Sequence, residues 1–180
     1  MLLTSDGVVF QLFCNTFLVA LVFAAAAVDI ATRKIPNALT YPAILIGLVL
    51  GSLSVGVTSS VGGLLIAAVP ALLLFVFGSL GGGDVKLLAA VGAGLGLPLI
   101  FDAWLYTLLA AVVVGVFQIL FSGRLQQVAN SVVFTFRSFI YPGVPTESAA
   151  GDFKMPFAVP IALGVITTMI APGYLASILR

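Results

Sequence analysis

Long apolar runs fill most of the chain, and short polar or glycine-rich segments separate them. The runs lie at about 8–28, 38–57, 61–80, 85–100, 103–121 and 156–179. A helix needs roughly 20 apolar residues to cross about 30 Å of hydrocarbon, and every run except the short, glycine-rich fourth approaches that length. The pattern therefore predicts an all-α membrane protein with about six transmembrane helices.

The longest connection between these runs covers residues 122–155. Within it, apolar residues recur at helical spacing over about 124–141, which predicts an amphipathic helix lying in the membrane interface. Such a helix either connects two spans along the lipid surface or guides a substrate, and the pattern does not separate these roles. Pro142, Gly143 and Pro145 follow and end the pattern, because proline interrupts helical hydrogen bonding.

The composition favours one membrane-embedded domain that covers residues 1–180. Hydrophobic residues make up 62% of the chain and charged residues only 7%, whereas a soluble globular domain carries about 25% charged residues. So few charges cannot cover a water-facing surface. The basic residues are scattered rather than gathered into a patch, which argues against nucleic acid as a partner.

The residue types also limit the chemistry. The chain has one cysteine, Cys14, and no histidine, so it can form neither an internal disulfide nor an ordinary Cys/His metal site. We therefore expect no metal and no cofactor. Any catalyst in this chain has to be built from carboxylates.

The distribution of basic residues predicts the orientation in the membrane. If the N-terminus lies outside, the basic residues of the loops all fall on the cytoplasmic side, as the positive-inside rule requires. These residues are Arg33, Lys34, Lys86, Arg124, Arg137 and Lys154, and only Arg180 lies outside. We therefore expect both termini outside a cytoplasmic (inner) membrane, with the loop 122–155 in the cytoplasm.

The first acidic motif follows the first apolar run. Asp29 stands at the predicted end of a helix, and Arg33, Lys34, Pro36 and Asn37 come after it. A negative charge near a helix C-terminus is unfavourable by up to about 1 kcal/mol. Arg33, four residues on, would offset part of this if the helix continued that far. Asp29 is either a charge that marks the membrane interface or a functional acid.

The second acidic motif opens the fourth run. Gly81, Gly82 and Gly83 precede Asp84, and Lys86 follows it. One interpretation is structural, with Asp84 as the N-cap of a helix and the glycines as a turn. The other is catalytic, because an acid that meets an extended peptide benefits from missing side chains on the approach. On this second view we expect Gly83 to take a positive φ that valine would resist.

The predicted topology brings both acids to the cytoplasmic membrane face. Two carboxylates that share one proton can activate water and protonate the leaving group of a peptide bond. A single carboxylate cannot hold both roles at once. The pair Asp29 and Asp84 is therefore a candidate catalytic dyad for peptide hydrolysis.

These residues resemble a known family. The stretch Asp-x-x-x-Arg-Lys-Ile-Pro-Asn at 29–37 and the stretch Gly-x-Gly-Asp-Val-Lys-Leu at 81–87 are similar to the two signatures of type IV prepilin peptidases, membrane aspartic peptidases of the Gly-x-Gly-Asp class. Residues 154–158 resemble the segment that leads into the last span of that family. The resemblance implies that Asp29 and Asp84 are catalytic. We expect the neighbouring motif residues to shape the site or bind substrate: Gly81, Gly82, Gly83, Lys86, Arg33, Pro36 and Asn37.

The resemblance also implies the substrate. Family members cut pilin precursors on the cytoplasmic side, between a short basic leader and a hydrophobic helix, so a pilin precursor, membrane lipid and the pilus assembly machinery are the expected partners. Larger bacterial members resemble this chain with an added N-methyltransferase insert that carries paired CxxC motifs. Because only Cys14 is present, methylation and zinc are not implied. The short form looks most like peptidases of tight-adherence (Flp-type) pili, and archaeal preflagellin peptidases are also similar; the oligomeric state stays open.

Two other functions compete with the peptidase interpretation. A small proton-coupled transporter or channel also uses membrane acids and glycine-rich helices. Its binding site is expected near the bilayer midplane, whereas Asp29 and Asp84 stand at the ends of predicted spans. A structural subunit of a secretion assembly would leave the three glycines unexplained.

Overall fold

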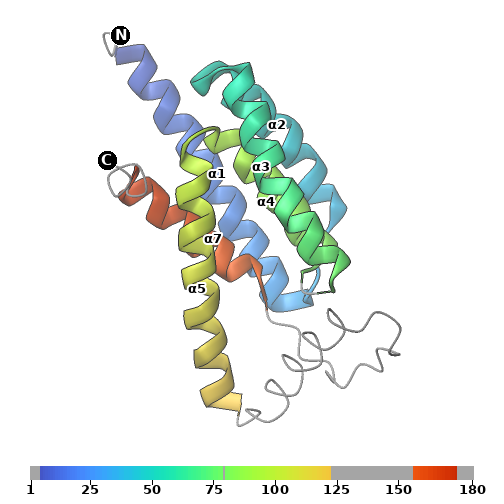
Figure 1. The fold of residues 1–180 in the computed structure, drawn as a ribbon. Coiled ribbons are helices and arrows are strands. Elements are labelled where there is room, and N and C mark those ends of the chain that lie inside the picture. Colours follow the sequence, from blue (N-terminus) through green and yellow to red (C-terminus); the bar gives the residue numbers. More distant parts are fainter. Residues whose placement is uncertain (1–4, 79, 123–155, 174–180) are drawn as a thin grey trace. The chain divides into compact units, whose positions relative to one another are not determined.

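The chain folds into helices, as the hydrophobic pattern predicts. The computed structural model describes residues 5–78, 80–122 and 156–173. These residues form α1 (Ser5–Thr32), α2 (Asn37–Val55), α3 (Val57–Val76), α4 (Gly82–Leu95), α5 (Leu99–Ser122) and α7 (Ala158–Ile170), shown in Figure 1. The all-α prediction is confirmed. Most of the predicted loop 122–155, including the amphipathic helix at 124–141, lies outside the described residues.

Four of these helices are long and apolar enough to cross a membrane: α1, α2, α3 and α5. Helices α4 and α7 have 14 and 13 residues, or about 20 Å at about 1.5 Å per residue. The predicted last run, 156–179, is interrupted because α7 ends before Pro172, which has no N–H to extend the ladder. Gly173 follows with a φ of 78°.

The chain divides into two compact units. The first contains residues 1–111 and 156–180, and the second contains residues 112–155. The described part of the second unit is the helical segment 112–122, in which the Phe117 and Phe121 rings stack with centroids 5.7 Å apart. All of the candidate site residues belong to the first unit.

Small residues bring the helices of the first unit together. Helix α4 packs against α2 and α3 and also contacts α1 and α7. The buried residues of α2 and α3 recur every three or four positions and are all small: Thr40, Ala43, Gly47, Gly51, Ser60, Gly63, Ala67 and Ala71. A Cβ on Gly63 would collide with the Gly92 carbonyl oxygen. Such close packing is how helices associate in lipid, where large apolar side chains can face outward.

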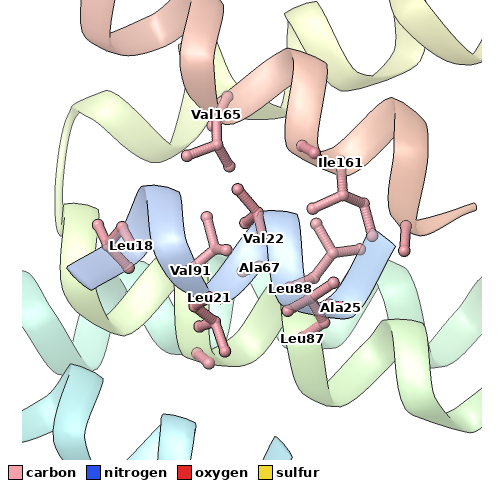
Figure 2. Packing of buried hydrophobic residues seen from close by; sticks show 14 of the residues in the cluster. Leu18, Leu21, Val22, Ala25, Ala67, Leu87, Leu88, Val91, Ile161 and Val165 are labelled. Carbon is pink, nitrogen blue, oxygen red and sulfur yellow. The ribbon is translucent and has the colours of Figure 1, made fainter. Parts of the chain in front are cut away.

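A hydrophobic cluster joins α1, α4 and α7 (Figure 2). Leu18, Val22 and Ala25 of α1 contribute to it together with Leu87 of α4 and Ile161 of α7, and all five are at most 1% exposed. The cluster lies along the half of α1 that ends at the first acidic motif. It therefore holds the beginnings of α4 and α7 beside the end of α1.

Candidate active site

Asp29 lies in the last turn of α1 and is only 6% exposed. The helix ends at Thr32, and Arg33 takes a left-handed conformation with a φ of 55°. The helix therefore does not continue to Arg33, which was the condition for the expected compensation of Asp29 along the helix.

The beginning of α7 contacts the Asp29 carboxylate. The Ala158 N–H donates a hydrogen bond of 3.2 Å to Oδ2 of Asp29. Ala158 is the first residue of α7, where backbone N–H groups lack helical acceptors and the helix dipole favours negative charge. The sequence pattern alone did not predict this contact. The signal that could have revealed it is the stretch 154–158, whose resemblance to the family indicates only that it leads into the last span.

Asp84 lies in the first turn of α4 but is not its N-cap. The N-cap is Gly81, whose N–H donates a hydrogen bond of 3.1 Å to Oδ2 of Asp84. Asp84 thus reaches back to the start of its own helix, as the acid of a capping box does. The N-cap interpretation is corrected by this geometry. The other oxygen, Oδ1, is buried and has no hydrogen-bond partner among the described residues.

The two acids are close enough to interact. Burial, and to a smaller extent the charge of Asp29, raise the pKa of the Asp84 carboxyl to about 6, although the hydrogen bond from the Gly81 N–H lowers it. Asp84 lies in the first turn of α4, and this helix begins at the end of the bundle where α1 ends (Figure 1). The two motifs, distant in sequence, thus contribute their acids to one place.

The three glycines before Asp84 have separate roles. A Cβ on Gly83 would lie 2.8 Å from Cβ and 3.1 Å from the carbonyl oxygen of Ile35, and one on Gly81 would lie 2.8 Å from Oδ2 of Asp84. A Cβ on Gly82 would meet only Phe75, at an ordinary 3.5 Å. The positive φ expected at Gly83 is wrong, because Gly83 is helical. Its missing side chain lets the loop of the first motif pack onto α4.

A polar contact also joins the two motifs. Lys86 Nζ donates a hydrogen bond of 2.6 Å to Oδ1 of Asn37, and it lies 4.5 Å from the centroid of the Tyr41 ring. Asn37 is the first residue of α2, and Pro36 is its N-cap. Lys86 and Asn37 are thus brought together beside the acids, whereas Arg33 and Pro36 lie on the neighbouring exposed loop.

A family model described as the type IV leader peptidase family matches residues 16–120, more than half of the chain. The chain belongs to the type IV leader peptidase family. Membership implies an aspartic-type prepilin peptidase activity. No curated protein and no solved structure matches the chain.

The leader peptidase match covers Asp29, Asp84 and the loop between α1 and α2. It ends before α7, so the contact between Asp29 and Ala158 comes from the fold alone. Among the described residues, no group of three or more His, Cys, Asp and Glu side chains is placed to hold a metal. The chemistry that the described arrangement offers is that of two carboxylates.

Proposed function

We propose that this chain removes the basic leader from type IV pilin precursors of the tight-adherence (Flp) kind, with Asp29 and Asp84 as its catalytic dyad. The observation that carries the proposal is the meeting of two buried acids from two separate motifs. Each accepts a backbone N–H at the beginning of a short helix. The charge of Asp29 also contributes to the raised pKa of Asp84.

A pair of carboxylates with one proton can perform the whole reaction. The ionised acid takes a proton from water while the water oxygen bonds to the peptide carbonyl carbon, and the protonated acid gives its proton to the carbonyl oxygen. The first acid then protonates the amide nitrogen, the second takes a proton from the tetrahedral diol, and the C–N bond breaks. The products are a carboxylic acid and an amine, and the pair returns to its initial state.

The proposed setting is the cytoplasmic face of the inner membrane, with about six spans and both termini outside. Four long apolar helices support a polytopic membrane protein, and the basic-residue bias supports this orientation. A pilin precursor would lie with its hydrophobic helix in lipid and its leader in water. The second unit, mainly the loop 122–155, would then belong to one peptidase domain of residues 1–180. The pilus assembly machinery is a further proposed partner.

The motif neighbours are proposed as residues that shape the site. Gly81 and Gly83 allow the close approaches at Asp84 and Ile35, and Lys86 bonds to Asn37. Gly82, Arg33 and Pro36 lie where a substrate could contact them, because they are partly or fully exposed. No observation favours a transporter, since both acids lie at helix ends rather than in helix centres.

The test is cleavage of a co-expressed pilin precursor by Asp29→Asn and Asp84→Asn variants, with membrane abundance as the control for folding. Each variant is expected to abolish cleavage, because each removes one of the two carboxylates that the reaction requires. Asp102→Asn, which changes a buried acid elsewhere, is the matched control and should cleave normally. Near-normal turnover by either dyad variant would remove the aspartic-peptidase assignment of this pair.

A further inference from the structure

The two carboxylates of the dyad have different surroundings. Both accept one backbone N–H at a helix beginning, Asp29 from Ala158 and Asp84 from Gly81. These bonds therefore do not distinguish the acids. The difference lies in their remaining oxygen atoms.

Oδ1 of Asp84 is buried and has no partner, whereas no oxygen of Asp29 is both buried and unpartnered among the described residues. An ionised oxygen without water or a donor is strongly disfavoured in a buried site. Protonation removes the charge and turns the carboxyl group into a hydrogen-bond donor. Protonation therefore stabilises the Asp84 carboxyl group more than it would stabilise that of Asp29.

We infer that the single proton of the dyad rests on Asp84 and that Asp29 is the ionised member, held in place by the first N–H of α7. This assignment rests on the proposed function. Asp29 is then the base that takes a proton from water, and Asp84 is the acid that protonates the substrate carbonyl oxygen. Ala158, through its N–H, is a positioning residue for the base.

The charges around the pair agree with this assignment. Helices α2, α3 and α7 contain no Asp, Glu, Lys or Arg, so in the part of the chain that the structure describes, the charged groups near Asp84 come from α1, α4 and the loop between α1 and α2. Lys86 of α4 is directed to Asn37 and Tyr41, and Arg33 and Lys34 are exposed. Asp29 is the charged group that acts on Asp84, and its negative charge favours the protonated form of Asp84.

Infrared spectroscopy of the full-length protein in detergent can locate the proton. The carbonyl stretch of a protonated aspartic acid, identified by ¹³C-aspartate labelling, is compared in wild type, Asp29→Asn, Asp84→Asn and Asp102→Asn. The spectra are taken at about pH 5, above the ordinary aspartic acid pKa of about 3.9 and below the value of about 6 for Asp84.

We expect the band in wild type and in Asp102→Asn, and its loss in Asp84→Asn. In Asp29→Asn the band should persist and titrate away at lower pH than in wild type, because burial of Asp84 remains while the neighbouring charge is gone. A band that disappears in Asp29→Asn and survives in Asp84→Asn overturns the assignment. So does a wild-type protein without a band that depends on Asp84.

The readout does not depend on cleavage, so the two proposals can fail separately. If both dyad variants are inactive but the band follows Asp29, the peptidase stands and the assignment of the proton fails. If the band follows Asp84 but Asp29→Asn still cleaves the precursor, the proton is located correctly and the proposed function fails.

Discussion

Asp84 and Asp102 occupy similar local positions in two different ends of the fold. Each lies in the first turn of a helix, α4 or α5, and each is less than a tenth exposed. Three glycines precede Asp84, whereas Leu99, Ile100 and Phe101 precede Asp102. Oδ2 of Asp102 accepts a hydrogen bond of 2.9 Å from the Gly173 N–H, in the turn after α7. Asp84 instead keeps a buried oxygen that has no hydrogen-bond partner among the described residues.

The difference separates a structural acid from the acid that we propose as catalytic. An acid in the first turn of a helix is favoured by the dipole and the open N–H groups whatever else it does. What sets Asp84 apart is a second acid that acts on it and an oxygen that the described fold leaves unused. Helix α7 connects the two ends, because Asp29 accepts from its first residue and Asp102 from the turn beyond its last.

The largest expected effect tests directly whether Asp84 and Asp102 differ in their importance for cleavage. Asp84→Asn should lower precursor cleavage by on the order of 10³-fold or more, since general acid–base groups contribute about 10²–10⁴-fold each. Asp102→Asn should stay within about twofold of wild type, because the asparagine carbonyl can still accept from Gly173. The double variant Asp29→Asn/Asp84→Asn should be scarcely worse than either single one, as residues acting as a unit are non-additive.

Initial cleavage rates of purified variants check this prediction, with helical content by circular dichroism as the folding control. If Asp102→Asn were as inactive as Asp84→Asn, the two acids would not differ in their importance for cleavage. If the double variant lost the sum of both single effects, the acids would act independently.

The glycines before Asp84 give the next largest effect. Gly83→Ala should destabilise the protein by about 1–3 kcal/mol, because its Cβ would press on the Ile35 backbone and side chain. Cleavage should fall by on the order of 10- to 100-fold, since small displacements of catalytic groups are costly. Gly82→Ala is the matched control, and it should be tolerated because its Cβ has room.

Thermal unfolding and cleavage rates of the two variants are compared in the same detergent. Equal loss of activity in both would mean that a substrate backbone, rather than Ile35, requires the glycines. A Gly83→Ala variant with full activity would show that the close contact between the two motifs is dispensable.

The sequence predicted the helices and the two acids better than the contacts between them. Length and hydropathy were sufficient to identify α1, α2, α3 and α5 as helices long and apolar enough to cross a membrane. The predicted helical run that contains α7 extends beyond the end of that helix. Pro172 and Gly173 hardly change the mean hydropathy of the run, but the helical backbone does not continue through them.

The contacts at the acids required the fold. Asp29 and Ala158 are separated by 129 positions, and no periodicity indicates which helix beginning meets a given carboxylate. The N-cap was placed wrongly because three consecutive glycines carry no periodic signal for where α4 begins. For the same reason the pattern could not distinguish Gly83, which contacts Ile35, from Gly82, which meets only Phe75.

The raised pKa of Asp84 predicts a pH-dependent stability. In the unfolded chain this carboxyl titrates near the ordinary value of about 3.9, and in the folded protein near 6. The folded state therefore binds the proton more tightly than the unfolded chain does. The contribution of Asp84 to the free energy of unfolding is complete below about pH 4 and is lost as the pH rises through about 6. The loss is on the order of 3 kcal/mol, at about 1.4 kcal/mol for each pKa unit.

Unfolding free energies measured between about pH 4 and pH 7 check this sign. Asp84→Asn should remove most of the decline over this range, because asparagine does not titrate, whereas Asp102→Asn should retain it. The raised pKa would be contradicted if the stability of the wild type rose over this range while the stability of Asp84→Asn did not depend on pH.

The smallest expected effect concerns the polar contacts that join helices at the two ends. Near the dyad, Lys86 bonds to Asn37 at 2.6 Å. At the Asp102 end, the Ser59 hydroxyl donates to the Leu97 carbonyl at 2.9 Å and accepts from the Leu97 N–H at 2.8 Å. Both contacts tie a helix beginning to α4 or to the turn after it, but only the first holds the motif that carries Asp29.

Lys86→Met keeps the apolar stem and removes the donor, so it should cost about 1 kcal/mol of stability and lower cleavage by a few-fold to about tenfold by loosening the first motif. Ser59→Ala should cost a similar stability without a specific loss of cleavage, because it acts far from the acids. A double-mutant cycle of Lys86→Met with Asn37→Ala should show coupling of about 0.5–1.5 kcal/mol. Additive effects in that cycle would mean that Lys86 acts on the substrate rather than on Asn37. If Ser59→Ala lowered cleavage as much as Lys86→Met does, the two ends of the fold would be equally important for the site.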